Sequence, residues 1–252
     1  MFKIFTHFRN LVIFSFICLI FSWSLPVQAD TKIDLKIDPQ LEQQVIEIIR
    51  KNPEIIIESV EAYQQQQQQK LQQSRQEFIN NLQTNPKTII GDSPTIGATQ
   101  SKTVLIEFSD FECPYCAEAH KKLKDLLAKY PNKFTLVYKY FPLYQIHEQA
   151  LPAATAAWAA FQQGKFWEYH DALFTNQKQL GETLYLDIAK RLKLNFTKFN
   201  NDRQLAIKPI QNDLLLAQKL GLGGTPSFII TSPNFSGPVK LTDIEKILQG
   251  KQ

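Results

Sequence analysis

The sequence has little cysteine: three residues among 252, at positions 18, 113 and 116. A structural zinc site wants four ligands, usually two Cys-x-x-Cys pairs or one pair with histidines, and only His120 stands close to the single pair here. Covalent haem attachment needs histidine directly after the second cysteine, where Ala117 stands. A structural disulfide between residues three apart would constrain almost no chain. Redox chemistry is therefore the favoured role for Cys113 and Cys116.

The sequence also lacks a large excess of charge and any internal repeat. Its 28 Lys and Arg residues face 24 Asp and Glu residues, which gives a formal charge of +4. So small an excess gives no indication of a nucleic-acid partner or of a polybasic contact with a membrane. The length suits one full domain plus an extension.

An apolar run from Leu11 to Trp23 is short for a membrane span, which needs about 20 residues. Lys3 and Arg9 precede it, and small residues around Ala29 follow it, in the order typical of a secretory signal peptide. We therefore predict a signal peptide over residues 1–29, with an uncleaved membrane anchor as the alternative. The protein is then exported to the periplasm or another extracytoplasmic lumen.

Export strengthens the redox interpretation of the cysteine pair. Cleavage after residue 29 would leave 26 basic and 24 acidic residues, a formal charge of +2. It would also leave only Cys113 and Cys116, in a compartment where disulfides persist.

The two cysteines stand where a predicted strand meets a predicted helix. Residues 103–111 are apolar and rich in β-branched and aromatic side chains, which suits a buried strand. Residues 114–129 place apolar side chains at helical spacing, with lysines on the other face. Free N–H groups and the positive end of the helix dipole favour a thiolate at a helix start. We therefore predict that the pKa of Cys113 lies well below that of a free cysteine, and Pro114 suits the first helical turn.

Residues 30 to about 90 have a different character from the rest. A short amphipathic helix is predicted first, and a longer one follows over about 54–81, with an apolar stripe from Ile56 to Leu82. The stripe can pack on the following domain, associate with copies of itself, or belong to a disordered linker. Exposed apolar stripes mark interfaces, so the sequence favours a homodimer or homotrimer formed through residues 40–84.

The remaining pattern predicts an α/β arrangement. A linker with a first strand is expected over residues 84–101, a strand parallel to the first buried one over 134–140, and helices throughout about 147–220. A short strand over 227–230 and a closing helix over 242–248 complete the chain.

The CPYC motif at a strand end, the helical block and a late Gly-Thr-Pro before a strand together resemble the DsbA-like branch of the thioredoxin superfamily. QGKFWEYHDALF at 163–174 resembles the signature helix of this branch. The resemblance covers roughly residues 95–250 and implies a thioredoxin fold with an inserted helical subdomain. The N-terminal helical extension is similar to that of oligomeric relatives of the suppressor-of-copper-sensitivity type. The implied domains are an extension over 30–92 and a DsbA-like domain over 93–252, with its insertion at about 147–220.

The resemblance assigns roles to individual residues. Cys113 matches the exposed, attacking cysteine and Cys116 the buried cysteine that resolves the mixed disulfide. Pro114 and Tyr115 match the dipeptide that tunes the redox potential. Thr225-Pro226 matches a substrate-binding loop beside the sulfurs, with the proline in cis, which would leave the backbone of the threonine free to pair with an extended client.

Glu107 matches the buried acid of the superfamily and is a candidate proton acceptor for Cys116. Its alternative is a surface carboxylate, but it stands inside the apolar run of the first buried strand. The three histidines at 120, 147 and 170 have no evident catalytic partner. Three aromatic residues of the helical block are expected in the core: Trp158, Phe161 and Trp167.

We therefore expect an exported thiol–disulfide oxidoreductase that acts on unfolded or misfolded secreted proteins, with the oxidase direction slightly favoured. A membrane partner would reoxidise or reduce the cysteine pair, and no cofactor or metal is expected. The extension speaks for the alternative of an oligomeric isomerase or reductase. A non-enzymatic chaperone or copper-handling protein is the third alternative.

Overall fold

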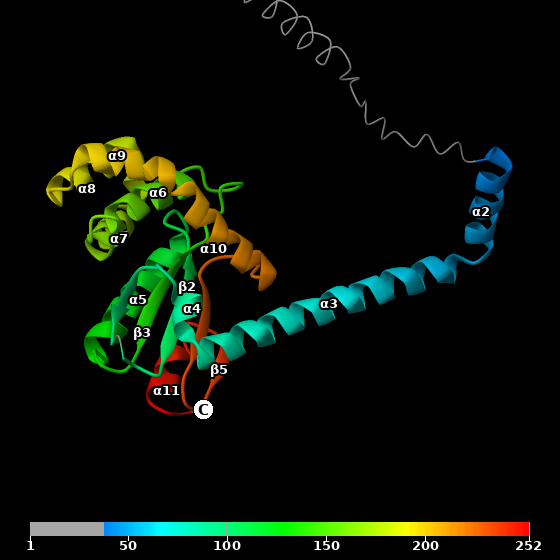
Figure 1. The fold of residues 1–252 in the computed structure, drawn as a ribbon, viewed down its shortest axis with the longest axis horizontal. Coiled ribbons are helices and arrows are strands. Elements are labelled where there is room, and N and C mark those ends of the chain that lie inside the picture. The colour runs from blue at the N-terminus through cyan, green and yellow to red at the C-terminus, as the bar shows by residue number, and fades with distance from the viewer. Residues whose placement is uncertain (1–37, 99, 252) are drawn as a thin grey trace, which may run out of the picture. The chain divides into compact units, whose positions relative to one another are not determined.

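The computed structural model describes residues 38–98 and 100–251 (Figure 1). The predicted signal peptide, residues 1–29, lies outside the described residues. The chain divides into two compact units with their boundary between Val60 and Glu61.

The second unit contains a five-stranded sheet in the order β1-β3-β2-β4-β5. The strands are β1 (Thr95–Gly97), β2 (Val104–Ser109), β3 (Thr135–Tyr140), β4 (Ser227–Thr231) and β5 (Ser236–Val239). β2 pairs parallel with β3, whereas the other three pairings are antiparallel. The predicted parallel pairing is thus confirmed, and β2 has a hydrogen-bonded neighbour on each side, as a central strand must.

Helices cover the sheet and form the expected block after β3. α5 (Pro114–Lys129) connects β2 to β3, and α11 (Ile244–Leu248) closes the chain. The block consists of α6 (Ala150–Phe161), α7 (Phe166–Thr175), a 3₁₀ turn η2 (Gln177–Gln179), α8 (Glu182–Arg191), α9 (Phe196–Leu205) and α10 (Ile207–Lys219). The predicted α/β class with an inserted helical subdomain is confirmed. β5 was not predicted, and α9 was expected only as part of a continuous helical pattern.

Every residue of β2 is buried, because both faces of the sheet are covered. Successive strand residues point to opposite faces. Val104, Ile106 and Phe108 pack in a core with α10, whereas Leu105 packs in a second core with α5 and α11. Glu107 has the same parity as Leu105 and therefore belongs to the face that α5 covers.

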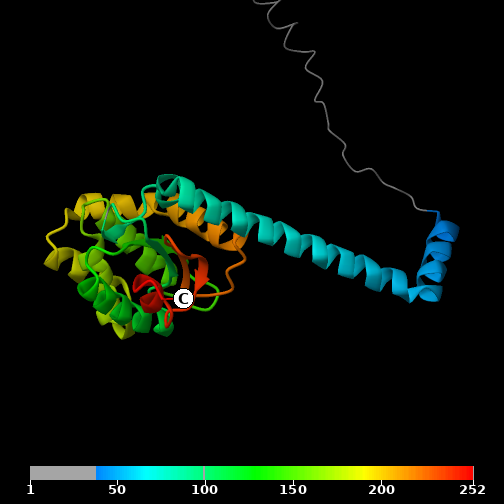
Figure 2. The same ribbon diagram turned by 90° about the horizontal axis from the view of Figure 1, so that it is seen from below.

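The extension is helical: α2 (Pro39–Lys51) and α3 (Pro53–Thr84) are followed by the short α4 (Pro86–Ile90). The second half of α3 meets the end of α10 (Figure 2), and its Phe78 and Leu82 are buried in the core of the second unit. Arg75 reinforces this contact, because its Nε donates to the carbonyl of Leu220 at 2.7 Å. The alternative in which the stripe packs on the following domain is therefore correct for these turns.

The earlier part of the stripe is not buried in this way. α2 contains no buried residue. Between Leu41 and Tyr63, ten large apolar residues each have a relative exposure of at least 41%. They are Leu41, Val45, Ile46, Ile48, Ile49, Ile55, Ile56, Ile57, Val60 and Tyr63. The single stripe predicted from the sequence is thus two surfaces with different surroundings.

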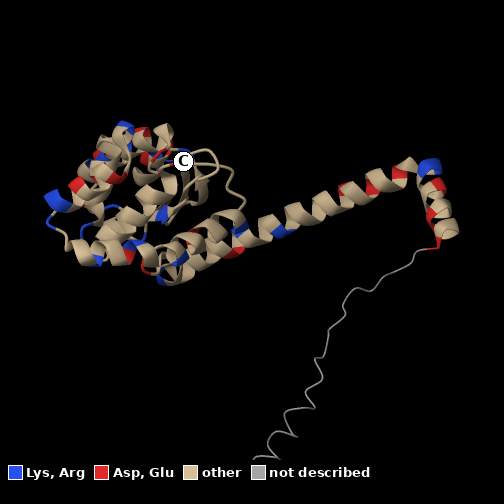
Figure 3. Ribbon diagram, turned by 90° about the horizontal axis from the view of Figure 1, so that it is seen from above, with Lys and Arg blue, Asp and Glu red and all other residues tan. Residues whose placement is uncertain are grey.

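Charges of both signs are interspersed over the helices, while the glutamine-rich middle of α3 carries none (Figure 3). Within residues 38–98 and 100–251, the helices are too short or too polar to cross a membrane.

Candidate active site

The structure places Cys113 and Cys116 at the start of α5, as predicted. Cys113 precedes the first residue of the helix, Pro114, and Cys116 lies one turn further on. Both cysteines are free thiols, and Cys116 is completely buried. Tyr115, between them, is 68% exposed, so the dipeptide of the motif faces solvent.

The resemblance implied that Cys113 is exposed, and the structure corrects this expectation. Its residue is only 4% exposed, because its sulfur lies 3.3 Å from the carbonyl oxygen of Thr225. That carbonyl belongs to the loop before β4, 112 residues away in sequence. The Thr225-Pro226 peptide bond is cis, as the resemblance implied. The sulfur is therefore covered by this loop.

The pKa values of the two thiols are shifted in opposite directions. The hydrogen bond from the Cys116 thiol lowers the pKa of Cys113 to about 5, although burial acts to raise it, and Thr225 and the N–H groups of the first turn act in the lowering direction. Burial raises the pKa of Cys116 far above that of a free cysteine. At neutral pH the pair is therefore one thiolate and one thiol, the combination that nucleophilic attack and later resolution require.

Alkylation against pH tests this separation. Only the thiolate reacts, so the rate for Cys113 should rise with pH and level off above a midpoint of about 5. Cys116→Ala removes the main cause of the shift, and its midpoint should move toward about 8.5, the value of a free cysteine. Stopped-flow alkylation with mass-spectrometric assignment measures both. A midpoint near that of a free cysteine in the unsubstituted protein would show that the thiolate is not stabilised.

Asp110 organises the approach to the cysteines and was not predicted. It is buried, and its N–H donates to the sulfur of Cys116 at 3.5 Å. Its carboxylate accepts from the N–H groups of Glu112 and Leu143, and His147 Nδ1 lies 2.7 Å from Oδ2. Partial burial acts to lower the pKa of His147, but the hydrogen bond with Asp110 and the nearby negative charges together outweigh it, so the pKa is raised.

A second contact that the sequence did not indicate comes from η2. Gln177 Nε2 donates to the carbonyl oxygens of Phe111 and Cys113, at 2.8 and 2.9 Å. The inserted helical block thereby holds the backbone that carries the first cysteine. No local spacing could have revealed this contact, because Gln177 is 66 residues from Phe111 and 64 residues from Cys113 in sequence.

Glu107 is buried at 1% exposure, so its alternative as a surface carboxylate is wrong. Burial raises the pKa of Glu107 to about 7, and Ser109 opposes the rise. The negative charge of this carboxylate also contributes to the raised pKa of Cys116. Glu107 lines a pocket of about 240 Å³ together with His120 and His170. A carboxyl that titrates near neutrality in such a place is able to exchange a proton.

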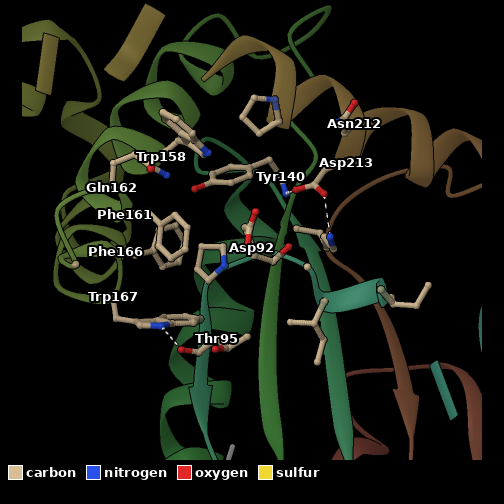
Figure 4. Close-up of a pocket in the computed structure, with 18 of the residues that line it drawn as sticks. Asp92, Thr95, Tyr140, Trp158, Phe161, Gln162, Phe166, Trp167, Asn212 and Asp213 are labelled. Atoms are coloured by element: carbon tan, nitrogen blue, oxygen red, sulfur yellow. Dashed lines mark hydrogen bonds and ion pairs between the residues drawn. The ribbon is translucent and has the colours of Figure 1, made fainter. Parts of the chain in front are cut away.

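A larger hollow of about 920 Å³ lies apart from the cysteines (Figure 4). Trp158, Phe161 and Trp167, which were expected in the core, are half-buried on its wall and pack on the core from there. Trp167 Nε1 donates to the carbonyl of Thr95 at 2.9 Å, as the figure shows. No residue of the CPYC motif or of Thr225-Pro226 lines it, so it is not part of the candidate site.

Comparison with known proteins identifies the family and the fold of the domain. A family model described as Thioredoxin matches residues 90–250. The solved structure of a thioredoxin-like oxidoreductase from Silicibacter pomeroyi is 31% identical and superposes with a TM-score of 0.57 over 66% of this chain and 97% of that one. The predicted thioredoxin fold is thereby confirmed.

The extension also has a counterpart among solved structures. ScsC from Proteus mirabilis is 26% identical, with a TM-score of 0.56 over 85% of this chain and 96% of that one. Its catalytic domain alone covers only 68% of this chain. The additional coverage shows that the similarity to ScsC extends beyond the catalytic domain.

A curated relative gives a different kind of match. The Na(+)/H(+) antiporter NhaA 3 of Salinispora tropica is 35% identical over 148 residues, which is 58% of this chain and 22% of the antiporter. This chain spans about a quarter of the length of the curated relatives it matches. The similarity therefore concerns one segment of those proteins.

Proposed function

The chain belongs to the thioredoxin family, and from this membership we propose that it is an exported thiol–disulfide oxidoreductase acting on secreted protein clients. The observation that carries the proposal is the pair of free cysteines with opposite pKa shifts at the start of α5, beside the Thr225 carbonyl. The structural similarity to a thioredoxin-like oxidoreductase supports the same activity.

In the reducing direction, the Cys113 thiolate attacks one sulfur of a client disulfide. The client S–S bond breaks, a mixed disulfide forms, and the departing client thiolate takes a proton. Cys116 then loses its proton and attacks the Cys113 sulfur, which releases the second client thiolate and leaves the pair oxidised. Glu107 is the proposed acceptor of the Cys116 proton, since its pKa of about 7 allows it to bind and release a proton near neutrality. Oxidation of a client dithiol is the same sequence in reverse.

The acidity of Cys113 favours the oxidising direction. Its pKa is lowered in the fold, so the thiolate's contribution to the stability of the reduced protein is fully present above about pH 8.5 and is lost as the pH falls through about 5. At neutral pH the reduced form is therefore stabilised, which makes the disulfide form the better oxidant. The extension supports the alternative, an oligomeric isomerase or reductase, because its exposed apolar side chains offer a surface for self-association.

A test of the proposal uses synthetic and protein clients of known disulfide state. We expect the oxidised protein to convert a reduced two-cysteine peptide to its disulfide, with one equivalent of the cysteine pair reduced per disulfide formed. A faster reaction with a client carrying wrong disulfides, starting from the reduced protein, would assign the isomerase role instead. Gel-shift alkylation of Cys113 and Cys116 in living cells then shows which form the partner maintains. Binding of unfolded clients without any thiol exchange would refute the oxidoreductase and indicate the chaperone.

A further inference from the structure

Two imidazoles and a carboxylate meet between α5 and α7, on the wall of the pocket that Glu107 also lines. His120 comes from α5, and His170 and Asp171 come from α7. Asp171 Oδ1 lies 3.7 Å from His120 Nε2 and 3.5 Å from His170 Nδ1. All three donor atoms lie within 4.8 Å of one another.

His170 is the most unusual member of this cluster. It is 3% exposed. Its Nδ1 lies 3.5 Å from Asp171 Oδ1, a long contact, and its Nε2 has no hydrogen-bond partner among the described residues. Buried polar groups in proteins are normally hydrogen-bonded, so this imidazole calls for a ligand. Its ring is fixed by edge contacts with Trp167 and Phe174. Its imidazole is therefore held in the pocket wall beside the two other donors, His120 and Asp171.

The spacing of the three donors suits a metal ion. Ligands at about 2.0–2.2 Å from a tetrahedral ion lie roughly 3.4 Å apart, close to the separations of Oδ1 from both imidazoles. Imidazole nitrogen with carboxylate oxygen is a donor set of zinc and related divalent ions. Lys124 Nζ bonds the other oxygen of Asp171, Oδ2, at 2.7 Å, which leaves Oδ1 for the ion.

The site has access and room. The pocket has a volume of about 240 Å³, and the Asp171 side chain is 38% exposed at its edge while His120 is 11% exposed. An ion can therefore enter from the Asp171 side and keep water as a further ligand. These residues are separate from the cysteine pair and from the Thr225-Pro226 loop.

We propose that His120, His170 and Asp171 form a site for a divalent transition-metal ion of the zinc type, with three protein ligands and one open position. This inference does not depend on the direction, or the existence, of thiol–disulfide exchange. The site needs no thiol, whereas the cysteine pair would offer sulfur ligands of its own. The two kinds of binding can therefore be separated by substitution.

Calorimetric titration with ZnCl₂ tests the site in the full chain with Cys18→Ser, Cys113→Ser and Cys116→Ser, so that no thiol remains. We expect saturable binding of one ion per chain. Co²⁺ bound at the same site should give the visible absorption of a four-coordinate complex, and Zn²⁺ should displace it.

Single substitutions in this cysteine-free background decide which residues hold the ion. His120→Phe keeps a ring stacked on Phe174 and Asp171→Asn keeps the shape of the side chain, so both should fold. Each should weaken Zn²⁺ binding by at least about tenfold, because loss of even an outer-shell partner of a ligand typically costs about 10–100-fold. Lys124→Met should tighten it, because it removes a positive charge that lies 2.7 Å from Asp171 Oδ2 and repels the ion.

His147→Gln is the matched control, since it removes an imidazole outside the cluster and should leave the affinity unchanged. Circular dichroism verifies that each variant is folded. Absence of saturable Zn²⁺ binding in the folded cysteine-free protein would overturn the proposal. Equal affinity in the control and in folded His120→Phe and Asp171→Asn would overturn it as well.

Discussion

Replacing Cys113 by serine is expected to reduce disulfide exchange to the uncatalysed background, whereas Cys116→Ser should trap mixed disulfides with clients. The first substitution removes the low-pKa thiolate that attacks. The second leaves the attacking sulfur in place but removes the thiol that releases the client. Non-reducing electrophoresis followed by mass spectrometry of the trapped species measures the second effect, and turnover of a two-cysteine peptide measures the first.

Lys121→Ala is the control for both variants, because this side chain is exposed on the same helix, α5. It should exchange disulfides at the rate of the unsubstituted protein. Retained turnover in Cys113→Ser would disprove the assignment of the attacking sulfur. Mixed disulfides that form through Cys116 in that variant would show that the roles of the two cysteines are reversed.

The protein is expected to be a dimer or trimer that depends on the apolar surface of residues 41–63. Ten large apolar side chains in this segment are exposed, and surfaces of this kind mark interfaces. Light scattering at tens of micromolar should therefore give two or three times the mass of one chain. A shortened chain that begins at Glu61 should be monomeric, because it loses nine of these ten side chains and keeps the turns of α3 that pack on the domain.

The start of the shortened chain matters for this experiment. A chain beginning near Gly91 would lose Phe78 and Leu82, which are 5% and 1% exposed, and would destabilise the domain for an unrelated reason. Ile48→Glu is a milder test, with Gln43→Glu as its control, since both add one charge to α2. Only the first should dissociate the oligomer. A whole chain that is monomeric at this concentration would refute self-association.

Helices and strands with a clear apolar pattern of their own were predictable from the sequence. The helical block that contains α7 (Phe166–Thr175) was predicted from its helical pattern, and β2 from its apolar run. The separate bounds of α9 were not predicted within the helical block, because only Phe199 and Asp202 of its ten residues are buried. The capping side chain of Asn195 was a usable signal. β5 contains Gly237 and Pro238, which are depleted in strands and tolerated at a sheet edge.

The cysteine pair of the candidate site was predictable from the sequence, but most of the residues that surround it were not. Position at a helix start indicated a low pKa for Cys113 without any tertiary information. The cover over its sulfur comes from Thr225 and the backbone clamp from Gln177, both far away in sequence. Asp110 stands next to the motif, but its partner His147 lies 37 residues further on. Only the fold brings these groups together, so spacing alone could not reveal them.

The packing of α3 limits how this domain can be inherited or transplanted. Its last turns contribute Phe78 and Leu82 to the same core as β2 and α10, and Arg75 bonds the end of α10. A gene segment that encodes only residues 90–250, the part matched by the family model, would therefore leave an uncovered patch on the sheet side that α10 faces. Recombination that moves the domain intact must carry the second half of α3 with it. The separable module begins inside a helix, near Glu61, and not in a loop.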